Sequence, residues 1–430
     1  MIVGITKPID HKFLTKEGDI MNPLYVGIDV SSRSNVAYLM KPDGSKHSNF
    51  SVPNSLDGSR QLVKRILSAI TSESLSDVII GLEATSVYGD NLVWFLREDG
   101  SLSSYNKRIH VLNPKQVNKF KQAYNDLPKN DYVDSFVIAD CLRFGRINKE
   151  VYLDDYRYKA LQNLTRARFF AVQNLVKEKQ RFLNYLFKKY STMAQEKVFS
   201  NTFSTSALAV YEEFDSAETL ADMDLQQLTE FLIQKGKNRF PDPESVAKAI
   251  QKAARSSYRL PKTINDSVNQ VLSISISSMK ALESQIKAFD KAIAAQMELI
   301  PNTLTSVNGI GPVYSAGIIA EIGDINRFPN QAALAKHAGL VWSQHQSGDF
   351  EVQNTRLIKS GNRYLKYYLC EAAMSLVRCD AEYSRFYHLK YKEVNKYQHK
   401  RALALTARKF VRLVFRLLKD NCLYRAPEAH

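Results

Sequence analysis

The sequence predicts an α/β domain with a mixed sheet, followed by a region that is entirely α-helical. Three observations predict this organisation. Short apolar runs rich in β-forming residues alternate with helical segments over 24–150. Apolar residues then recur at helical spacing over 151–300, where they include a seven-residue repeat. The last segment, 301–430, ends in a basic amphipathic helix.

The α/β domain is predicted to begin with a hairpin, because two apolar runs flank a polar turn, and to continue with alternating helices and strands. Residues 1–23 carry charges throughout and lack the apolar stretch of a secretory signal, so we expect a lead-in segment. The expected elements are strands over 24–30 and 35–40, a helix over 56–70, a strand over 77–83, a helix over 88–96, a strand over 109–112 and a helix over 131–144.

The helical spacer over 151–300 is basic at its start, with eight Lys or Arg and one acid from Lys159 to Tyr190. A heptad repeat near its end is compatible with a coiled coil between copies or with a helix of an intramolecular bundle. The repeat places Leu272, Met279, Ile286, Ile293 and Ile300 at one position and Ser275, Leu282, Phe289 and Gln296 three residues on. An insertion over about 192–261 is more polar and less regular, and the sequence assigns it no role.

The C-terminal domain, 301–430, opens with NGIGPVYSAGIIAEI, which resembles a helix-hairpin-helix element. Gly309 and Gly311 would let the backbone turn tightly and present amides to a phosphate, although an ordinary helix-joining turn has the same pattern. The terminal helix has a predicted inner stripe of Leu403, Ala407, Phe410, Val414 and Leu417. From Arg385 to Arg425 there are twelve Lys or Arg against two acids, with tyrosines and a phenylalanine interleaved, a composition that suits nucleic acid or a solvated basic face.

The whole-chain composition favours a polyanionic partner. The formal net charge is +15, for which nucleic acid is the default partner. No apolar run approaches the roughly 18 residues of a membrane-spanning helix. The four cysteines lie far apart without metal-ligand spacing, which suits a reducing cytosol. We therefore expect a cytoplasmic protein without a membrane partner.

Four acids have a placement typical of a metal site. Asp29 and Glu83 end two predicted strands, and Asp131 and Asp134 lie on one face at the start of a helix. If the strands are neighbours and the helix covers their ends, the four side chains offer the oxygen ligands of two hard divalent cations, the arrangement of two-metal phosphoryl transfer. Each acid alone has a structural alternative, such as a strand-end turn or a helix N-terminal carboxylate. Asp140, six residues after Asp134, is expected to be solvated.

The motifs around these acids are GIDVS, GLEATSVYGDNL, VLNPKQVNKFKQA and KNDYVDSFVIADCLRFG. Together they resemble the RuvC-like domain of the DEDD transposases, the insertion-sequence one-ten family, which includes the Piv-type DNA invertases. The resemblance implies an RNase H-like fold, two Mg²⁺ ions, and Asp29, Glu83, Asp131 and Asp134 as the four catalytic acids. Thr85 and Tyr88 also match the family's Glu-x-Thr-x-x-Tyr form.

The C-terminal motifs GLVWSQHQSGDF and RLIKSGNRYLKYYL resemble the transposase domain of the same family. The resemblance implies that Ser347 is the catalytic serine, with Ser343 as the second candidate. The chain departs from the family pattern at Val341 and Trp342, where a proline is usual, and at Ile358, where a serine is usual. His345 is two residues from Ser347, but no motif supports a hydrolase triad there.

The resemblance further implies a transposase that cuts and rejoins donor and target DNA, with Ser347 attacking a phosphodiester. It implies homodimers or homotetramers with composite active sites, and guidance by a structured non-coding (bridge) RNA. The residues expected to contact nucleic acid are Arg166, Arg168, Gly309, Gly311, Arg356, Lys359, Arg363, Lys400, Arg401, Arg408 and Lys409.

Three other functions fit parts of the sequence. A Holliday-junction nuclease would use the same four acids with water as nucleophile. A non-catalytic nucleic-acid-binding protein would use the acids for structure only. An actin-like ATPase is suggested by GIDVS alone, but the chain has no later glycine-rich phosphate loops of that form.

Overall fold

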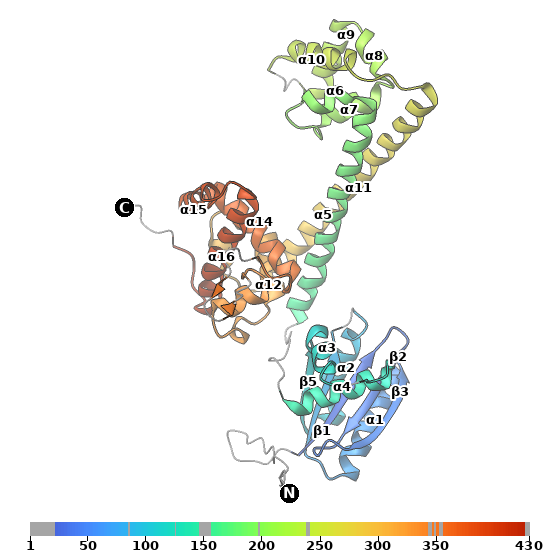
Figure 1. Ribbon diagram of the computed structural model, residues 1–430, viewed down its shortest axis with the longest axis vertical. Coiled ribbons are helices and arrows are strands. Elements are labelled where there is room, and N and C mark those ends of the chain that lie inside the picture. The colour runs from blue at the N-terminus through green and yellow to red at the C-terminus, as the bar shows by residue number, and fades with distance from the viewer. Residues whose placement is uncertain are drawn as a thin grey trace. The chain divides into compact units, whose positions relative to one another are not determined.

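A computed structural model of the chain describes residues 22–84, 87–124, 126–145, 156–196, 198–237, 241–342, 346–347, 350–351 and 356–425. The chain forms two compact units, Met1–Tyr152 and Leu153–His430 (Figure 1). Each unit has its own buried core. Within the described ranges, every helix is too short or too polar to cross a membrane.

The first unit contains a five-stranded mixed sheet in the order β3-β2-β1-β4-β5. The strands are β1 Pro23–Val30, β2 Ser34–Met40, β3 Lys46–Pro53, β4 Asp77–Glu83 and β5 Asn106–Leu112. β1, β2 and β3 pair antiparallel, whereas β1, β4 and β5 pair parallel. This arrangement is compatible with the expected RNase H-like domain. β3 was absent from the prediction, because this edge strand is polar and buries little apart from Phe50 and Val52.

Helices cover both faces of this sheet. On one face, Leu24, Val26 and Ile28 of β1 pack with α1 Leu56–Ser72 and α2 Asp90–Glu98. On the other, Tyr25 packs with α4 Asp131–Phe144 and with α3 Pro114–Lys121. The predicted bounds of α4 and β4 are confirmed, whereas α2 begins two residues later than predicted and α3 was not predicted.

A helical hairpin forms the stalk of the second unit. α5 Tyr156–Lys189 and α11 Lys262–Glu298 run antiparallel along one another, joined by contacts such as the Arg168–Asp290 ion pair and the Ser275 hydroxyl on Glu178 (Figure 1). Heptad residues of α11, including Leu272 and Met279, are buried. The repeat therefore packs within the chain, as in the intramolecular alternative.

The insertion that the sequence left without a role is folded. Its described residues form five helices, and their shared core includes Phe182 of α5 and Tyr190, which directly follows α5. Ser204, Ser216, Asp224 and Asp242 cap four of the helices with side-chain hydrogen bonds. Each helix is short, so the apolar period was hard to detect. They are α6 Ser191–Glu196, α7 Thr205–Glu213, α8 Ala217–Asp222, α9 Leu225–Gly236 and α10 Pro243–Arg255.

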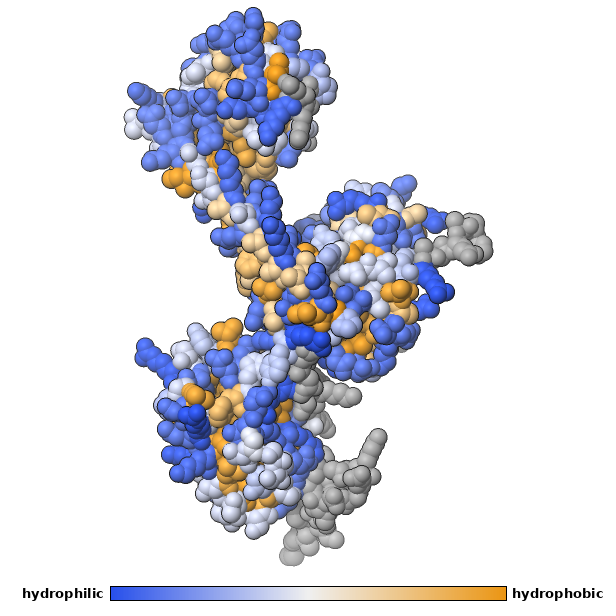
Figure 2. Space-filling model, turned by 180° about the vertical axis from the view of Figure 1, so that it is seen from behind, coloured by the Kyte–Doolittle hydropathy of each residue, from blue (hydrophilic) through white to orange (hydrophobic). Residues whose placement is uncertain are grey.

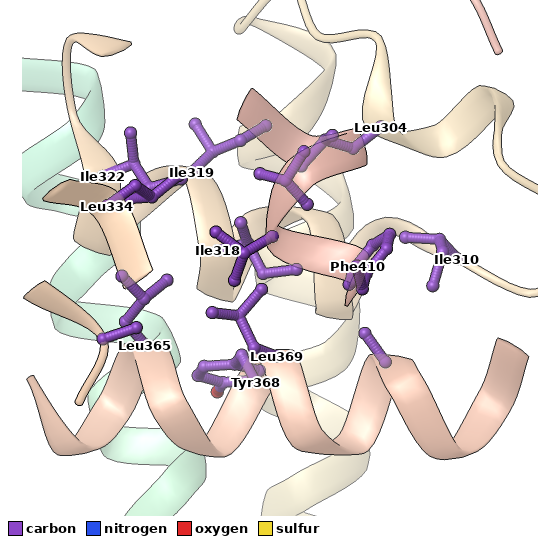
Figure 3. Close-up of a cluster of buried hydrophobic side chains, with 14 of the residues drawn as sticks. Leu304, Ile310, Ile318, Ile319, Ile322, Leu334, Leu365, Tyr368, Leu369 and Phe410 are labelled. Atoms are coloured by element: carbon purple, nitrogen blue, oxygen red, sulfur yellow. The ribbon is translucent and has the colours of Figure 1, made fainter. Parts of the chain in front are cut away.

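The C-terminal helices pack around a second core, shown in Figure 3, where Ile318, Leu369 and Phe410 from three helices meet. The Tyr368 hydroxyl donates to the Thr165 carbonyl at 2.7 Å, which joins this core to α5. Four of the five predicted stripe residues of α16 are buried, and Leu403 is partly buried. The helices are α12 Pro312–Ile322, α13 Gln331–His337, α14 Arg363–Cys379, α15 Ala381–Lys392 and α16 Gln398–Lys419, with 3-10 turns at Leu304–Ser306 and Ile325–Arg327.

Candidate functional site

Asp29 and Glu83 lie at the carboxyl ends of the adjacent parallel strands β1 and β4. The last registered residues of this pair are Ile28 and Leu82, so the two acids come next in each strand. Each acid follows a glycine by two positions, and residues two apart in a strand share a face. Both carboxylates therefore project from the face that carries α4.

Two glycines allow α4 to lie directly on the sheet. Gly27 and Gly81 are paired across β1 and β4. A Cβ atom on Gly27 would lie 2.1 Å from the Ser135 carbonyl oxygen and 2.4 Å from the Ala139 amide nitrogen, so only glycine fits there. At Gly81 such an atom would lie 2.8 Å from the methyl carbons of Leu142. The missing side chains thus set the distance between the helix and the two strand-end acids.

The first turn of α4 carries the other two acids, Asp131 and Asp134. Asn130 caps this helix, since its side chain accepts from the Val133 amide at 2.9 Å. Asp131 is exposed and Asp134 is half-buried. Lys121, at the end of α3, donates to Asp134 Oδ1 at 2.5 Å. Sequence reasoning did not single out Lys121, although it lies inside the VLNPKQVNKFKQA motif.

The four acids share one electrostatic environment. Burial, followed by the negative charges of Asp131 and Asp134, raises the pKa of Asp29 to about 6. Burial, followed by the charges of Asp29 and Asp134, also raises the pKa of Glu83. Lys121 opposes both shifts with its positive charge. The acids therefore lie near enough to affect one another electrostatically, and their role as ligands of a metal ion stays a prediction.

The donor set suits a hard divalent cation, because all four groups are carboxylates. Within the described ranges, however, no three His, Cys, Asp or Glu side chains are grouped tightly enough to hold a metal ion. The Lys121 ammonium supplies the positive charge at Asp134.

Asp140 is buried, which corrects the expectation that it is solvated. It accepts hydrogen bonds from the Tyr124 hydroxyl and from the Arg143 guanidinium, the latter at 2.8 Å. Because Tyr124 and Arg143 already occupy its carboxylate, Asp140 has a structural role on α4 and is not counted among the four acids.

Ser347 lies in a two-residue strand, β6 Gln346–Ser347, that pairs antiparallel with β7 Phe350–Glu351. We call these two strands, together with the bridge of Trp342 and Leu357 that flanks them in the sequence, the serine hairpin. Its base is held by the bridge between Trp342 and Leu357 and by the Ile358 amide, which donates to the Val341 carbonyl at 3.0 Å. Thr85, Ser343 and His345 lie outside the described residues, as do the side-chain surroundings of Ser347.

The backbone beyond this base is packed without intervening side chains. A Cβ atom on Gly361 would lie 2.6 Å from Gly339 Cα, and one on Gly339 would lie 2.7 Å from the Ser360 carbonyl oxygen. The Asn362 amide donates to the His337 carbonyl at 2.7 Å. Gly361 and Asn362 therefore fix the chain that leads from the hairpin into α14.

Two of the expected nucleic-acid contacts are engaged inside the protein. Arg166 donates to Glu321 at 2.7 and 2.9 Å, and Arg168 pairs with Asp290. Glu321 is buried and also accepts from the Asn362 side chain at 2.6 Å. Both arginines thus have structural roles, and their contact with nucleic acid stays a prediction.

The two glycines of the hairpin-like element differ in their surroundings. Gly309 has φ +87°, and a Cβ atom there would lie 2.9 Å from Cys379 Cβ, so packing against α14 already requires glycine. Gly311 is exposed and immediately precedes α12. The space beside Gly311 is open, so a phosphate can approach it. At Gly309, packing against α14 is enough to explain why the residue is glycine.

The remaining basic candidates differ in exposure. Arg356, Lys359, Arg363 and Lys400 are exposed. On α16, Arg401 pairs with Glu393 at 2.9 Å, and Lys409 pairs with Glu382 at 2.5 Å. Arg408 is partly buried, and burial lowers its pKa. The exposed residues are those best placed to reach a polyanion.

Comparison with known proteins gives concordant similarities. A family model described as a transposase matches residues 26–190, and one described as the IS116/IS110/IS902 family of transposases matches residues 302–388. The uncharacterized 44.8 kDa protein of insertion element IS116 from Streptomyces clavuligerus is 26% identical over 334 residues, which cover 75% of this chain and 79% of that protein. A probable family 20 transposase from Pseudomonas aeruginosa is 30% identical over 105 residues, 24% of this chain and 31% of that protein.

Proposed function

Because the chain belongs to the IS116/IS110/IS902 family of transposases, we propose that it recombines DNA by cation-dependent phosphoryl transfer with a serine nucleophile. The observation that carries this proposal is the placement of Asp29, Glu83, Asp131 and Asp134 in one electrostatic environment at the edge of an α/β sheet. Carboxylates that raise one another's pKa in this way favour a cation or a proton beside them.

Asp29, Glu83, Asp131 and Asp134 would hold Mg²⁺, since their oxygens are the ligands that this cation prefers. When bound, two such ions supply charge neutralisation at the attacking and leaving oxygens of a phosphodiester. The protein's own contribution is to position the acids: Gly27 sets how closely α4 approaches, and the capped first turn aims Asp131 and Asp134. The Lys121 ammonium would offset part of the negative charge at Asp134.

Ser347 would provide the nucleophilic oxygen. Its hydroxyl oxygen forms a bond to phosphorus, the phosphorus–oxygen bond to the leaving strand breaks, and the hydroxyl proton passes to a base. The resulting serine–DNA phosphodiester keeps the bond energy. The hydroxyl of an incoming DNA strand can therefore attack its phosphorus, release the serine and join the new strand. Support for this role comes from the resemblance of the segment around Ser347 to the transposase domain of the family.

The acids and the serine belong to different units of the chain, so the proposed site forms when two units meet, within one chain or between copies. Exposed residues on α11 support association between copies. Ile274, Ala281, Ala288 and Ala295 repeat every seven residues and are exposed, while the other heptad seam faces α5. Figure 2 shows apolar residues among polar ones along the stalk. We therefore propose a homodimer or homotetramer.

A structured non-coding RNA is the proposed guide that pairs with donor and target DNA. Support comes from the family resemblance and from the net charge of +15, which suits a large polyanion. RNA that co-purifies with the protein from its host, and that is transcribed beside the gene, is the expected finding.

The catalytic proposal is tested with four variants, Asp29→Asn, Glu83→Gln, Asp134→Asn and Ser347→Ala, and with Ser343→Ala as the matched control. Each of the four should abolish strand transfer on plasmids that carry the element's ends, while DNA affinity stays within about twofold of wild type. Asp29→Asn should also abolish Mg²⁺-dependent nicking, and Ser347→Ala should abolish the covalent protein–DNA adduct seen on denaturing gels.

The outcomes separate the alternatives. A Ser347→Ala variant that still cleaves DNA points to a water-using nuclease, and an active Asp29→Asn variant points to a non-catalytic binding protein. If Ser343→Ala loses the covalent adduct while Ser347→Ala still forms it, the nucleophile is Ser343.

A further inference from the structure

Aromatic and guanidinium groups gather where α5 passes the N-terminal end of α14. We call them the aromatic–arginine cluster, which consists of Phe169, Phe170, Tyr364, Tyr367, Arg166 and Arg363. The catalytic proposal uses none of the four rings. α14 begins at Arg363, directly after the backbone that holds the base of the serine hairpin.

The rings meet mainly edge to face. Phe169 lies 5.2 Å from Tyr364 and 4.9 Å from Tyr367 between ring centroids, with interplanar angles of 84° and 76°. Phe170 lies 5.5 Å from Phe169 and 6.0 Å from Tyr364. This geometry is favourable for aromatic pairs, so the four rings stabilise one another.

The cluster runs from the core to the surface. At its inner end, Tyr367 contacts the fully buried Tyr368 at 5.0 Å. At its outer end, Phe170 is 46% exposed. A large aromatic ring half open to water gains little for the fold and presents a surface on which another flat group can stack.

The two arginines differ in their partners. Arg166 lies 4.6 Å from the Tyr364 ring and is neutralised by Glu321. Arg363 lies 4.8 Å from the Tyr364 ring and 5.4 Å from the Phe170 ring, and it is exposed. Within the described residues no carboxylate pairs with Arg363. The outer end of the cluster thus combines an exposed ring, a planar guanidinium and an uncompensated positive charge.

We propose that the aromatic–arginine cluster binds an unpaired base of single-stranded DNA. Phe170 and Arg363 provide flat surfaces on which a base stacks, and the charge of Arg363 attracts the adjoining phosphate. Paired bases inside a duplex present no free face, so the cluster selects opened strands. This inference rests on the proposed recombinase function, because strand exchange is what releases single strands beside the serine hairpin.

The test measures binding of fluorescein-labelled oligothymidylate and of a duplex of the same length, by anisotropy, with the full-length protein. Phe170→Ala should weaken single-strand binding about fivefold to a hundredfold, the loss of one base stack, and should change duplex binding less than twofold. Val176→Ala is the matched control, because Val176 is 57% exposed on the same helix and lies outside the cluster. The melting temperature of each variant verifies that folding is retained.

Arg363→Lys keeps the charge and removes the plane, so it should lose part of the single-strand affinity while keeping the salt dependence. Wild-type affinity for single strands in Phe170→Ala, or an equal loss for duplex, would overturn the cluster proposal alone. Stronger binding of an RNA strand of the same sequence would also overturn it. Failure of the wild-type protein to bind any DNA would instead count against the recombinase function.

Discussion

Asp29 is a residue at which burial and neighbouring charge act in the same direction. Its carboxyl is partly removed from water, and Asp131 and Asp134 add negative potential, so the protonated form is favoured. A recombinase gains from this arrangement, since carboxylates that repel one another bind a divalent cation with a large release of electrostatic energy. The same repulsion costs stability in the absence of the cation.

Asp29→Asn should therefore stabilise the first unit in the presence of a chelator. The pKa of Asp29 is about 6 in the folded chain and 3.8 without the fold, so stability falls as pH rises from about 4 to 6 and is flat above that. We expect a gain of about 1 kcal/mol in the free energy of unfolding at pH 7.5, after allowance for solvent screening. The gain should vanish near pH 3.5. Urea unfolding measures it, with the exposed Asp57→Asn as control.

Glu321 is the residue on which several structural contacts of the C-terminal domain depend. Its side chain is 1% exposed and accepts from Arg166 and Asn362. Glu321→Ala would remove the buried acceptor that Arg166 and Asn362 share, at a cost of about 3 kcal/mol. Glu244→Ala, which removes an exposed pair on α10, should cost less than about 0.5 kcal/mol. Equal effects of the two substitutions on urea unfolding would contradict the structural role of Glu321.

At the scale of elements, the packing of α4 on β1 decides whether the acids meet. Gly27 faces the backbone of α4, so no side chain of β1 separates this strand from the helix at that point. An added methyl group must push the helix away from the sheet, since neither the Ser135 carbonyl nor the Ala139 amide can rotate aside.

Gly27→Ala should lower the free energy of unfolding of the first unit by about 1–3 kcal/mol, the usual cost of overpacking. It should also reduce Mg²⁺-dependent nicking, because Asp131 and Asp134 move away from Asp29. Gly100→Ala is the control, since a Cβ atom there meets no other atom within 4 Å. Unchanged nicking in a destabilised Gly27→Ala variant would separate helix position from catalysis.

At the scale of the whole molecule, the net charge of +15 governs association with nucleic acid. Each phosphate that the protein neutralises releases condensed counterions, so affinity falls with salt at a slope of about −0.9 per contact on duplex DNA. We expect a steep linear decrease in log affinity between 50 and 200 mM salt, measured by anisotropy. Arg363→Ala and Lys400→Ala should each reduce the slope by about one if these exposed residues contact phosphate. An unchanged slope would remove them from the interface.

The sequence by itself determined the α/β-then-α organisation, the four acids and the family. These features are local: strand runs, the helix with an i, i+3 acid pair, and motifs that hold short spacings. It also determined α4 and β4 to the residue, since Asn130 caps one and apolar β-formers fill the other. Polar or short elements, such as β3 and the insertion helices, gave too weak a periodicity to detect.

Tertiary structure alone decided how the parts are used. It placed Lys121 on Asp134, buried Asp140 against Tyr124, and paired Arg166 with Glu321. The partners in each of these contacts are separated in the sequence, so only the three-dimensional fold brings them together. It also showed that the heptad residues of α11 pack on α5, and that Gly27 and Gly81 set the distance between α4 and the sheet. A sequence states which side chains are available, whereas three-dimensional packing fixes which of them neutralise one another and which stay free for a ligand.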